Sequence, residues 1–243
     1  MKYNKARALD NLISINSWLI KIKNSGCNGV VLGLSGGKDS TIVAMLAKLV
    51  WGNNVLGLIM PNQSRDDVFV AANIAECLTL TIKYVPISTL YDNILNENYE
   101  IFTEKAQSNV APRLRMTMLY LYAQNLGYRV IGTGNRSERY IGWCTKHGDM
   151  ACDFNPIAHL TCTEVIELGH LLADMFDLPH DYIERPPADG ITGKTDEENF
   201  GFTYKQLDAY LFDGSSGDPV IDTKIEKMHE AAKHKLTMPA TME

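Results

Sequence analysis

The residues best suited to chemistry lie in the stretch VVLGLSGGKDS, residues 30–40. Gly36 and Gly37 lack a Cβ, so their backbone can adopt positive φ angles and approach a ligand closely. A helix that begins directly after them leaves free N–H groups that can hold an anion, most naturally a phosphate. Asp39 adds a hard oxygen donor suited to Mg²⁺ and Lys38 adds a positive charge. The stretch therefore predicts a phosphate-binding loop.

The stretch differs from the common phosphate loop GxxxxGK[ST]. Leu32 stands where that motif has its first glycine, and Asp39 follows Lys38 where the motif has Ser or Thr. The alternative interpretation is an ordinary turn between a strand and a helix, with Ser35 as the helix cap. A strand before the loop and a helix after it are the context that a phosphate loop requires, and they favour the functional interpretation.

The elements that must position this loop follow from hydrophobic periodicity. Apolar residues predict a strand over Val30–Leu34, and a helical pattern follows from Asp39 through Lys48. The same patterns predict helices over Lys5–Lys23, Asp66–Leu78 and Asn109–Asn125, and strands over Val55–Met60, Thr81–Ile87 and Arg129–Gly132. Strands that alternate with helices predict an α/β fold, a doubly wound parallel sheet flanked by helices, with its ligand at the carboxyl ends of the strands.

Two of these helices have apolar residues at helical spacing, which predicts their buried sides. In the first helix the recurring apolar residues are Leu9, Leu12, Ile13, Trp18, Leu19 and Ile20. In the helix that begins at Asn109 the expected buried residues are Leu114, Met118, Leu121 and Tyr122.

Composition sets the outer limits. The chain has 243 residues, 45% hydrophobic and 21% charged, which predicts one globular domain over 1–243, with Pro186–Phe200 as its one long mobile segment. No apolar run approaches a membrane span, and a net charge of −6 argues against a nucleic-acid partner. Five cysteines, an odd number, without an apolar leader indicate reduced thiols and a cytoplasmic protein.

The glycine loop resembles the PP-loop, SGGxDS, of the N-type ATP pyrophosphatases. These enzymes cut ATP between its α and β phosphates and activate a carbonyl or carboxylate as an adenylate. The positions that match the motif are Ser35, Gly36, Gly37, Asp39 and Ser40.

Later segments narrow the resemblance to ammonia-dependent NAD synthetase. They are Gly132–Glu138, Ile141–Asp149 and Asp153–Pro156, and the likeness extends from about Leu9 to Lys235. The resemblance implies an adenine nucleotide alpha hydrolase-like fold. It also implies that the enzyme uses ATP and Mg²⁺ to adenylate nicotinic acid adenine dinucleotide (deamido-NAD), after which ammonia displaces AMP to give NAD.

The resemblance also implies roles for individual residues. The residues expected to bind ATP are Gly33, Leu34, Ser35, Gly36, Gly37, Lys38, Asp39, Ser40 and Thr133. The catalytic and Mg²⁺-binding residues are Asp39 and Glu138. The residues expected to bind deamido-NAD are Arg113, Lys146, Asp153, His234 and Lys235. The family builds its substrate site between two subunits, which implies a homodimer in which the helix from Asn109 is a candidate interface and the His-Lys pair reaches the partner's substrate.

Some positions depart from the family pattern. Cys162 stands where the family has a lysine that touches ATP phosphate, and a thiol cannot replace that cation. Either Lys38 or Lys194 compensates, or ATP turnover is weakened. The segment Pro186–Asp189 lacks the Ser or Thr hydroxyl that is common there.

Several alternatives stay open. Cys144, His147, Cys152, His159 and Cys162 have ligand chemistry for zinc, but their spacing is poor and no CxxC occurs. Only 29 residues precede the first strand, which predicts no glutaminase domain and free or partner-delivered ammonia as nitrogen donor. The competing functions are another PP-loop adenylating enzyme, such as one that modifies tRNA, and a nucleotide-binding homologue with weakened catalysis.

Overall fold

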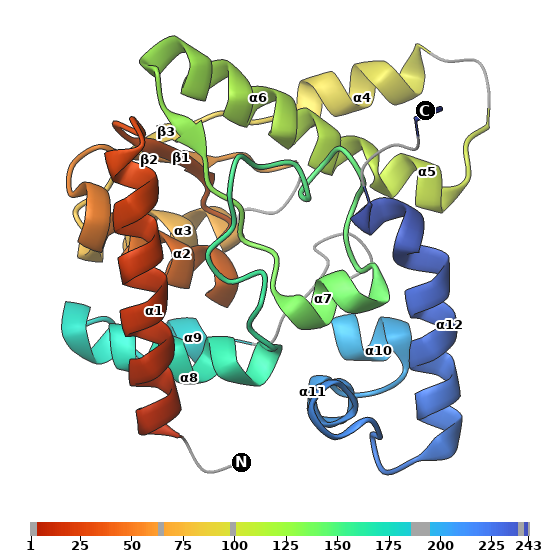
Figure 1. The fold of residues 1–243 in the computed structure, drawn as a ribbon. Helices are drawn as coiled ribbons and strands as arrows, with labels where there is room; N and C mark the ends of the chain where they lie inside the picture. The colour runs from red at the N-terminus through yellow and green to blue at the C-terminus, as the bar shows by residue number, and fades with distance from the viewer. Residues whose placement is uncertain (1–3, 63–65, 98–100, 186–194, 238–240, 243) are drawn as a thin grey trace.

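A parallel sheet forms the centre of the molecule. The structure, a computed structural model, describes residues 4–62, 66–97, 101–185, 195–237 and 241–242. Within these residues four strands pair in the order β3-β2-β1-β4 (Figure 1). The strands are β1 (Val30–Gly33), β2 (Val55–Ile59), β3 (Thr81–Tyr84) and β4 (Arg129–Val130). All four predicted strands are confirmed, although each ends earlier than the sequence predicted.

The strand order explains where a ligand can bind. Val30 on β1 pairs with Val55 on β2 and with Arg129 on β4, so β1 is an interior strand. The loops that leave the carboxyl ends of β1 and β4 are therefore neighbours, although they are far apart in the sequence. Beyond β4, a single parallel bridge joins Ile131 to Phe154 and continues the sheet edge.

The third strand is shorter than predicted because a proline follows it. The sequence predicts a strand over Thr81–Ile87, whereas β3 ends at Tyr84. Pro86 has no backbone N–H to donate to a ladder. The chain therefore leaves the sheet there, although the backbone of Ile87 still donates a hydrogen bond to the carbonyl oxygen of Pro61 at 3.0 Å.

Helices cover both faces of the sheet, as buried parallel strands require (Figure 1). On one face lie α1 (Lys5–Asn24), α2 (Lys38–Trp51), α3 (Asp66–Cys77), α8 (Cys162–Phe176) and α9 (Asp181–Glu184). On the other face lie α4 (Ser88–Asn96), α5 (Glu104–Ser108) and α6 (Val110–Leu126). The predicted doubly wound α/β fold is thus confirmed.

A separate cluster of helices packs beside the sheet. It contains α7 (Arg136–Ile141), α10 (Asp196–Phe200), α11 (Tyr204–Asp213) and α12 (Pro219–Leu236). Their common core is built around Phe200, which is 2% exposed, with Phe202, Leu207 and Ile225 packed around it.

The predicted buried sides of two helices need correction. The buried side of α1 is formed by Ala8, Leu12, Ile15 and Leu19. The other apolar residues predicted for α1 are exposed, namely Leu9, Ile13, Trp18 and Ile20. In α6, Leu121 is 58% exposed, while Leu114, Met118 and Tyr122 are half-buried. Both helices carry apolar residues around much of their circumference, so spacing alone does not select the side that meets the core.

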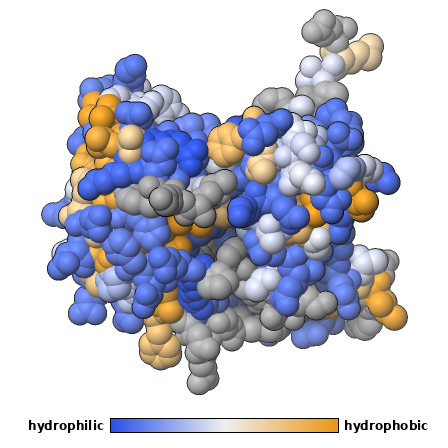
Figure 2. Space-filling model, turned by 90° about the horizontal axis from the view of Figure 1, so that it is seen from below, coloured by the Kyte–Doolittle hydropathy of each residue, from blue (hydrophilic) through white to orange (hydrophobic). Residues whose placement is uncertain are grey.

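The segment predicted to be mobile falls partly outside the described residues. Residues 186–194 lie outside them, whereas the remainder of Pro186–Phe200 ends in α10, with Asp196 and Phe200 buried. No helix among the described residues is long and apolar enough to cross a membrane. Seen from below, the molecule presents a largely hydrophilic face on which hydrophobic residues gather only in small patches (Figure 2).

Candidate active site

Of the two loop glycines, only Gly36 has a positive φ, whereas Gly37, the N-cap of α2, has a φ of −81°. Gly36 has a φ of +82°, and a Cβ at this position would lie 3.0 Å from the carbonyl oxygen of Asp67 and 3.2 Å from the Cβ of Val70. Only glycine combines this dihedral angle with this close approach. The loop therefore packs closely against α3.

Hydroxyl groups within the loop hold it in place. The backbone N–H of Gly37 donates to Ser35 Oγ at 3.2 Å, and Ser40 Oγ donates to the carbonyl oxygen of Gly37 at 2.9 Å. Gly33 ends β1, and the N–H of Leu34 donates to Leu58 on β2, so the loop leaves the sheet at a fixed point. The amino end of α2 thus faces the carboxyl edge of the sheet, an arrangement that suits an anion.

Lys38 and Asp39 form a buried ion pair at the first turn of α2. Lys38 is only 3% exposed, and its Nζ lies 2.6 Å from Asp39 Oδ2. The same ammonium lies over the ring of Tyr204, 5.7 Å from its centroid. Burial opposes the charge of Lys38, but Asp39 and its other acidic neighbours outweigh burial and raise its pKa above the usual range. Lys38 is therefore a charged group in a nearly closed environment.

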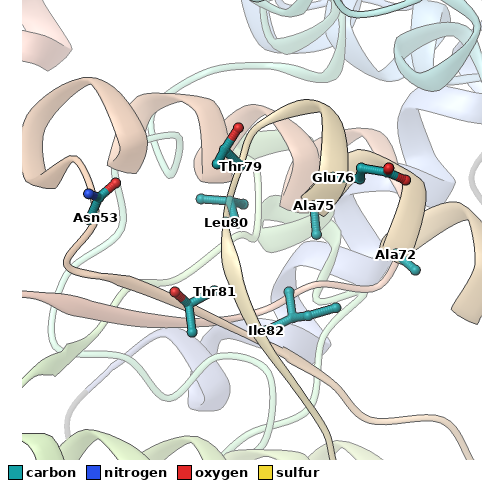
Figure 3. A pocket seen from close by; sticks show the side chains of 8 residues that line it. All are labelled: Asn53, Ala72, Ala75, Glu76, Thr79, Leu80, Thr81 and Ile82. Carbon is teal, nitrogen blue, oxygen red and sulfur yellow. The ribbon is translucent and has the colours of Figure 1, made fainter.

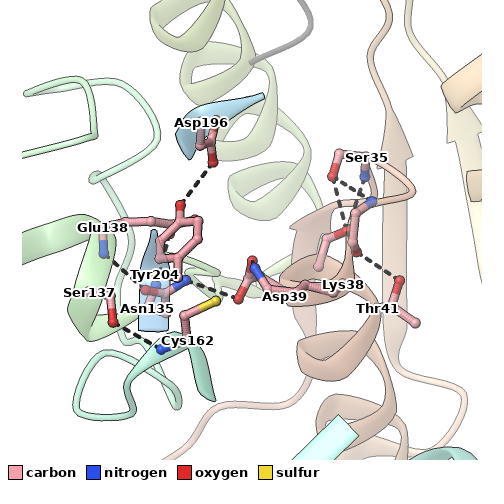
Figure 4. Close-up of polar contacts among 12 residues, drawn as sticks. Ser35, Lys38, Asp39, Thr41, Asn135, Ser137, Glu138, Cys162, Asp196 and Tyr204 are labelled. Atoms are coloured by element: carbon pink, nitrogen blue, oxygen red, sulfur yellow. Dashed lines mark hydrogen bonds and ion pairs between the residues drawn. The ribbon is translucent and has the colours of Figure 1, made fainter. Parts of the chain in front are cut away.

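The loop after β4 meets this pair. Asn135 caps α7: its side chain accepts from the N–H of Glu138 at 3.0 Å, and the Glu138 carboxylate accepts from the N–H of Asn135 at 3.2 Å. Asn135 Nδ2 also donates to Asp39 Oδ1 at 3.2 Å (Figure 4). Asp39, which follows β1, and Glu138, which follows β4, are thus linked through Asn135. Thr133 lies partly buried in the same loop.

The two carboxylates influence each other. Burial, and then the negative charge of Asp39, raise the pKa of Glu138 to about 8, while Lys38 opposes the rise. Among the described residues, no group of three or more His, Cys, Asp or Glu side chains is arranged to hold a metal ion. Two carboxylates completed by phosphate oxygens and water nevertheless form a donor set that suits Mg²⁺. The residues present therefore fit a metal that arrives with a nucleotide.

Cys162 lies in the same cluster, at the first residue of α8. Its side chain is 3% exposed and points toward Asp39 (Figure 4). Burial raises the pKa of the Cys162 thiol well above its usual range, so the thiol is neutral. Lys38 stands close enough that its charge lowers that pKa. Of the two lysines expected to compensate for Cys162, Lys38 lies beside it, and Lys194 lies outside the described residues.

Four further polar residues of this site were not assigned a role from the sequence. The Tyr204 hydroxyl donates to Asp196 Oδ2 at 2.9 Å, and this bond holds the ring beside Lys38. Asp208 is fully buried and accepts from the Thr163 N–H at 2.7 Å and from the hydroxyl of Ser137. These bonds join α7, α8, α10 and α11 around the ion pair.

A local signal for these helices was present in the sequence. Capping boxes, in which Thr or Asn precedes Glu or Gln by three residues, begin α7, α8, α10 and α11. The pattern predicts the residues at which these helices start. It does not reveal that Asp208, in the second turn of α11, reaches the first amides of α8.

The residues expected to bind deamido-NAD form two groups. Arg113 Nε and Nη2 each lie 3.4 Å from the carbonyl oxygen of Lys146, to which they donate. Lys146 Nζ donates to the carbonyl oxygen of His234, and Lys235 Nζ donates to that of Gly142 at 2.8 Å. Those four residues are therefore brought together. The fifth, Asp153, instead accepts from the N–H of Val130 on β4 at 2.6 Å.

A hollow elsewhere on the molecule does not belong to this cluster. It lies beside the amino ends of β2 and β3, at the opposite end of the strands from the glycine loop (Figure 3). Its lining residues are Asn53, Ala72, Ala75, Glu76, Thr79, Leu80, Thr81 and Ile82. None of them is a residue that the sequence analysis assigned to a site.

Comparison with known proteins yields consistent matches. Residues 13–239 match the model of the NAD synthase family. The chain is 38% identical over 224 residues to the NH₃-dependent NAD⁺ synthetase of Finegoldia magna, a match that covers 90% of this chain and 91% of that protein.

Solved structures agree with these matches. The NMN synthetase from Francisella tularensis superposes with a TM-score of 0.88 at 32% identity, covering 97% of this chain and 98% of that chain. The NH₃-dependent NAD synthetase from Campylobacter jejuni, solved in complex with a nitrate ion, superposes with a TM-score of 0.75 at 30% identity and covers 100% of both chains.

Proposed function

The chain belongs to the NAD synthase family, and on that premise we propose that it is a ligase that amidates deamido-NAD with ammonia at the expense of ATP. The observation that carries the proposal is the meeting of the glycine loop after β1 with Glu138 after β4, through the bond from Asn135 to Asp39. This meeting gathers phosphate-binding amides, a cation and two carboxylates at one edge of the sheet.

The reaction proceeds in two steps. An oxygen of the nicotinate carboxylate attacks the α-phosphorus of ATP, the bond between the α and β phosphates breaks, and pyrophosphate leaves. Ammonia then attacks the carbonyl carbon of the adenylate, loses a proton, and AMP leaves with the bonding electrons. A carboxylate is a poor electrophile, so catalysis depends on positioning and on neutralising the charge that passes to pyrophosphate.

The loop residues carry out most of that work. The amino end of α2 and the N–H group of Gly36 hold the departing pyrophosphate. Lys38 supplies a positive charge at the same end of the helix. Asp39 and Glu138 would hold Mg²⁺, which when bound neutralises phosphate charge. Thr133 lies beside these groups, in the loop after β4, and we assign it to ATP binding.

Deamido-NAD binds where basic side chains gather outside the loop. We assign this role to Arg113, Lys146 and the pair His234 and Lys235, which meet around residues 142–146. In the free enzyme the two lysines bind backbone carbonyl oxygens, so substrate phosphates would compete with these bonds. Asp153 is assigned with them on the family resemblance alone.

The first test is to supply ATP, Mg²⁺ and deamido-NAD with either ammonium or glutamine, and to measure pyrophosphate and NAD. NAD is expected with ammonium and little NAD with glutamine, because we propose that residues 1–243 act as a single synthetase domain that takes ammonia as its nitrogen donor. Bound ATP without turnover would favour a nucleotide-binding homologue. Pyrophosphate release with another acceptor would favour a different adenylating enzyme.

A second candidate substrate is nicotinic acid mononucleotide. The observation that favours it is the superposition on the NMN synthetase from Francisella tularensis, whose TM-score of 0.88 exceeds the 0.75 found for the Campylobacter jejuni NAD synthetase. The same assay run with the mononucleotide in place of the dinucleotide separates the two candidates. The preferred substrate is the one with the higher kcat/KM.

We propose that the enzyme is a homodimer that pairs through α4 and α6. These helices pack against each other on the outer face of the sheet (Figure 1), and α4 has no buried residue. Leu90, Leu121 and Leu126 are 42%, 58% and 44% exposed, so an apolar surface is left uncovered by the chain itself. Exposed apolar surface is typical of interfaces.

Light scattering tests the dimer. The wild-type chain is expected at twice the monomer mass, and Leu121→Glu at the mass of one chain, because a carboxylate on the apolar surface opposes pairing. Phe69→Glu is the matched control, since Phe69 is 68% exposed on α3, on the opposite face of the sheet. A dimer that survives Leu121→Glu would contradict this interface.

The enzyme is proposed to act in the cytoplasm. Its five cysteines are all free thiols in the structure, and Cys27 and Cys162 are buried among apolar residues. Free thiols suit a reducing compartment. Its proposed partners are the small molecules ATP, deamido-NAD and ammonia, together with a second copy of the chain.

A further inference from the structure

The ammonium of Lys38 lies where the carboxylates of the site need a positive charge. Its Nζ is 2.6 Å from Asp39 Oδ2, and its charge also acts on Glu138. Its side chain is 3% exposed and is screened from water by the ring of Tyr204. These two carboxylates are the same groups that we assign to Mg²⁺.

An ammonium and a divalent cation cannot occupy the same side of one carboxylate. A buried lysine is costly unless it is paired, and an ionised carboxylate in an enclosed site is costly unless a cation lies near it. Lys38 meets both needs in the free enzyme. A metal ion that binds Asp39 through Oδ2 would therefore have to displace Lys38.

We propose that Lys38 is a built-in counter-ion that holds the Asp39–Glu138 pair in the free enzyme and turns from Asp39 to the bound triphosphate when a divalent cation takes its place. Lys38 is the first residue of α2, directly after the glycine loop, so rotation about its own side-chain bonds is enough to redirect the ammonium. The second half of this inference, the transfer to triphosphate, rests on the proposed function. The first half rests on the ion pair alone.

The neutral thiol at Cys162 fits this arrangement. Cys162 lies within the electrostatic reach of Lys38 and is as deeply buried, at 3% exposure. A lysine at position 162 would bring a second ammonium toward the same carboxylates. The chain therefore places one mobile positive charge at position 38, and position 162 contributes only a small apolar side chain.

The test is Mn²⁺ binding to the nucleotide-free protein, followed by the electron paramagnetic resonance signal of free Mn²⁺. Lys38→Met removes the charge and keeps an unbranched chain, and it is expected to bind Mn²⁺ about tenfold more tightly or better, because the competitor is gone. The affinity for ATP, measured with Mg²⁺ by calorimetry, is expected to fall in the same variant. Lys48→Met, on the same helix but bonded to Asn53 and Thr79, is the matched control and is expected to leave both affinities unchanged.

Two further variants test whether the gain in Mn²⁺ affinity comes from the lost charge of Lys38. Lys38→Gln keeps a hydrogen-bond donor for Asp39 without the charge and is expected to repeat the gain in Mn²⁺ affinity. Adding Cys162→Lys to Lys38→Met restores one ammonium to the enclosure, and Mn²⁺ affinity is expected to return toward the wild-type value. Circular dichroism melts identify any variant that has lost its fold.

The Mn²⁺ measurement uses neither ATP nor a nicotinate substrate, so it stands even if the enzyme proves to act on another acceptor. Unchanged or weaker Mn²⁺ binding in both folded Lys38 variants would overturn the counter-ion role. Tighter Mn²⁺ binding with unchanged ATP affinity would overturn the transfer to triphosphate and leave Lys38 as a static partner of Asp39.

Discussion

Asp39→Ala is expected to lower the rate of pyrophosphate release by roughly a thousandfold or more, the scale seen when a preorganised charge-stabilising group is removed. Asp39 is the point at which the two loops meet, since it accepts from both Lys38 and Asn135. Without it the proposed metal loses a ligand and Lys38 loses its partner. Steady-state pyrophosphate assays at saturating substrate measure the effect.

The control for this prediction is Asp174→Ala. Asp174 is exposed on α8 and pairs only at the surface with His180. This variant is expected to retain wild-type activity, because a surface ion pair contributes little to stability. Near-normal activity in Asp39→Ala would remove the assignment of Asp39 to catalysis and to the metal.

Glu138→Gln separates the charge of Glu138 from its capping role. A glutamine can still accept from the Asn135 N–H, as Glu138 does at 3.2 Å, so α7 should keep its start. Activity is expected to fall as far as in Asp39→Ala, because a neutral amide replaces the carboxylate assigned to the metal. Because the pKa of Glu138 is about 8 in the folded protein and 4.5 in a model peptide, ionisation opposes folding as pH rises between these values. Glu138→Gln should therefore melt above wild type at pH 8 and match it below pH 4.5.

Asp208→Ala is expected to lower the free energy of unfolding by roughly 1.5 to 3 kcal/mol, the range for losing buried hydrogen bonds to a charged group. Asp208 is fully buried and accepts from the Thr163 N–H and the Ser137 hydroxyl. Ser137 Oγ in turn accepts from the Cys162 N–H at 2.9 Å. The change leaves the first amides of α8 without their carboxylate. Urea unfolding measures the loss.

Asp213→Ala supplies the matched control for Asp208. Asp213 is exposed at the last residue of α11, so its removal is expected to change the free energy of unfolding by less than about 0.5 kcal/mol. A loss below about 1 kcal/mol in Asp208→Ala would mean that water or another donor replaces the carboxylate. Activity should fall together with stability, because Ser137, which bonds Asp208, also holds the backbone of Cys162 beside the Lys38–Asp39 pair.

The sheet and the two loops were predictable because their signals are local. Five apolar residues, two glycines and a helical pattern are contiguous in the sequence, and the parallel sheet follows from the alternation of elements. The meeting of Asp39 and Glu138 followed from that topology, since carboxyl-end loops of neighbouring strands must converge. Family resemblance then supplied candidate roles that spacing alone could not.

The remainder of the site depends on contacts between residues far apart in the sequence. Tyr204 reaches Lys38 from another helix, and Asp208 reaches α8 across forty-five residues. No periodicity encodes which buried hydroxyl meets which carboxylate. The exposed side of α6 was missed for a related reason, because a helix apolar around its circumference does not reveal which side belongs to the chain's own core.

The strand order β3-β2-β1-β4 bears on how the protein is made. β1 emerges early from the ribosome and pairs with β2 soon afterwards, but its other edge must wait for β4, which includes Val130. During that interval of synthesis a nascent chain carries an apolar, unpaired edge, the kind of surface on which chains aggregate. A chaperone that shields the N-terminal half during this interval would therefore raise the yield of folded enzyme, without altering any contact in the finished site.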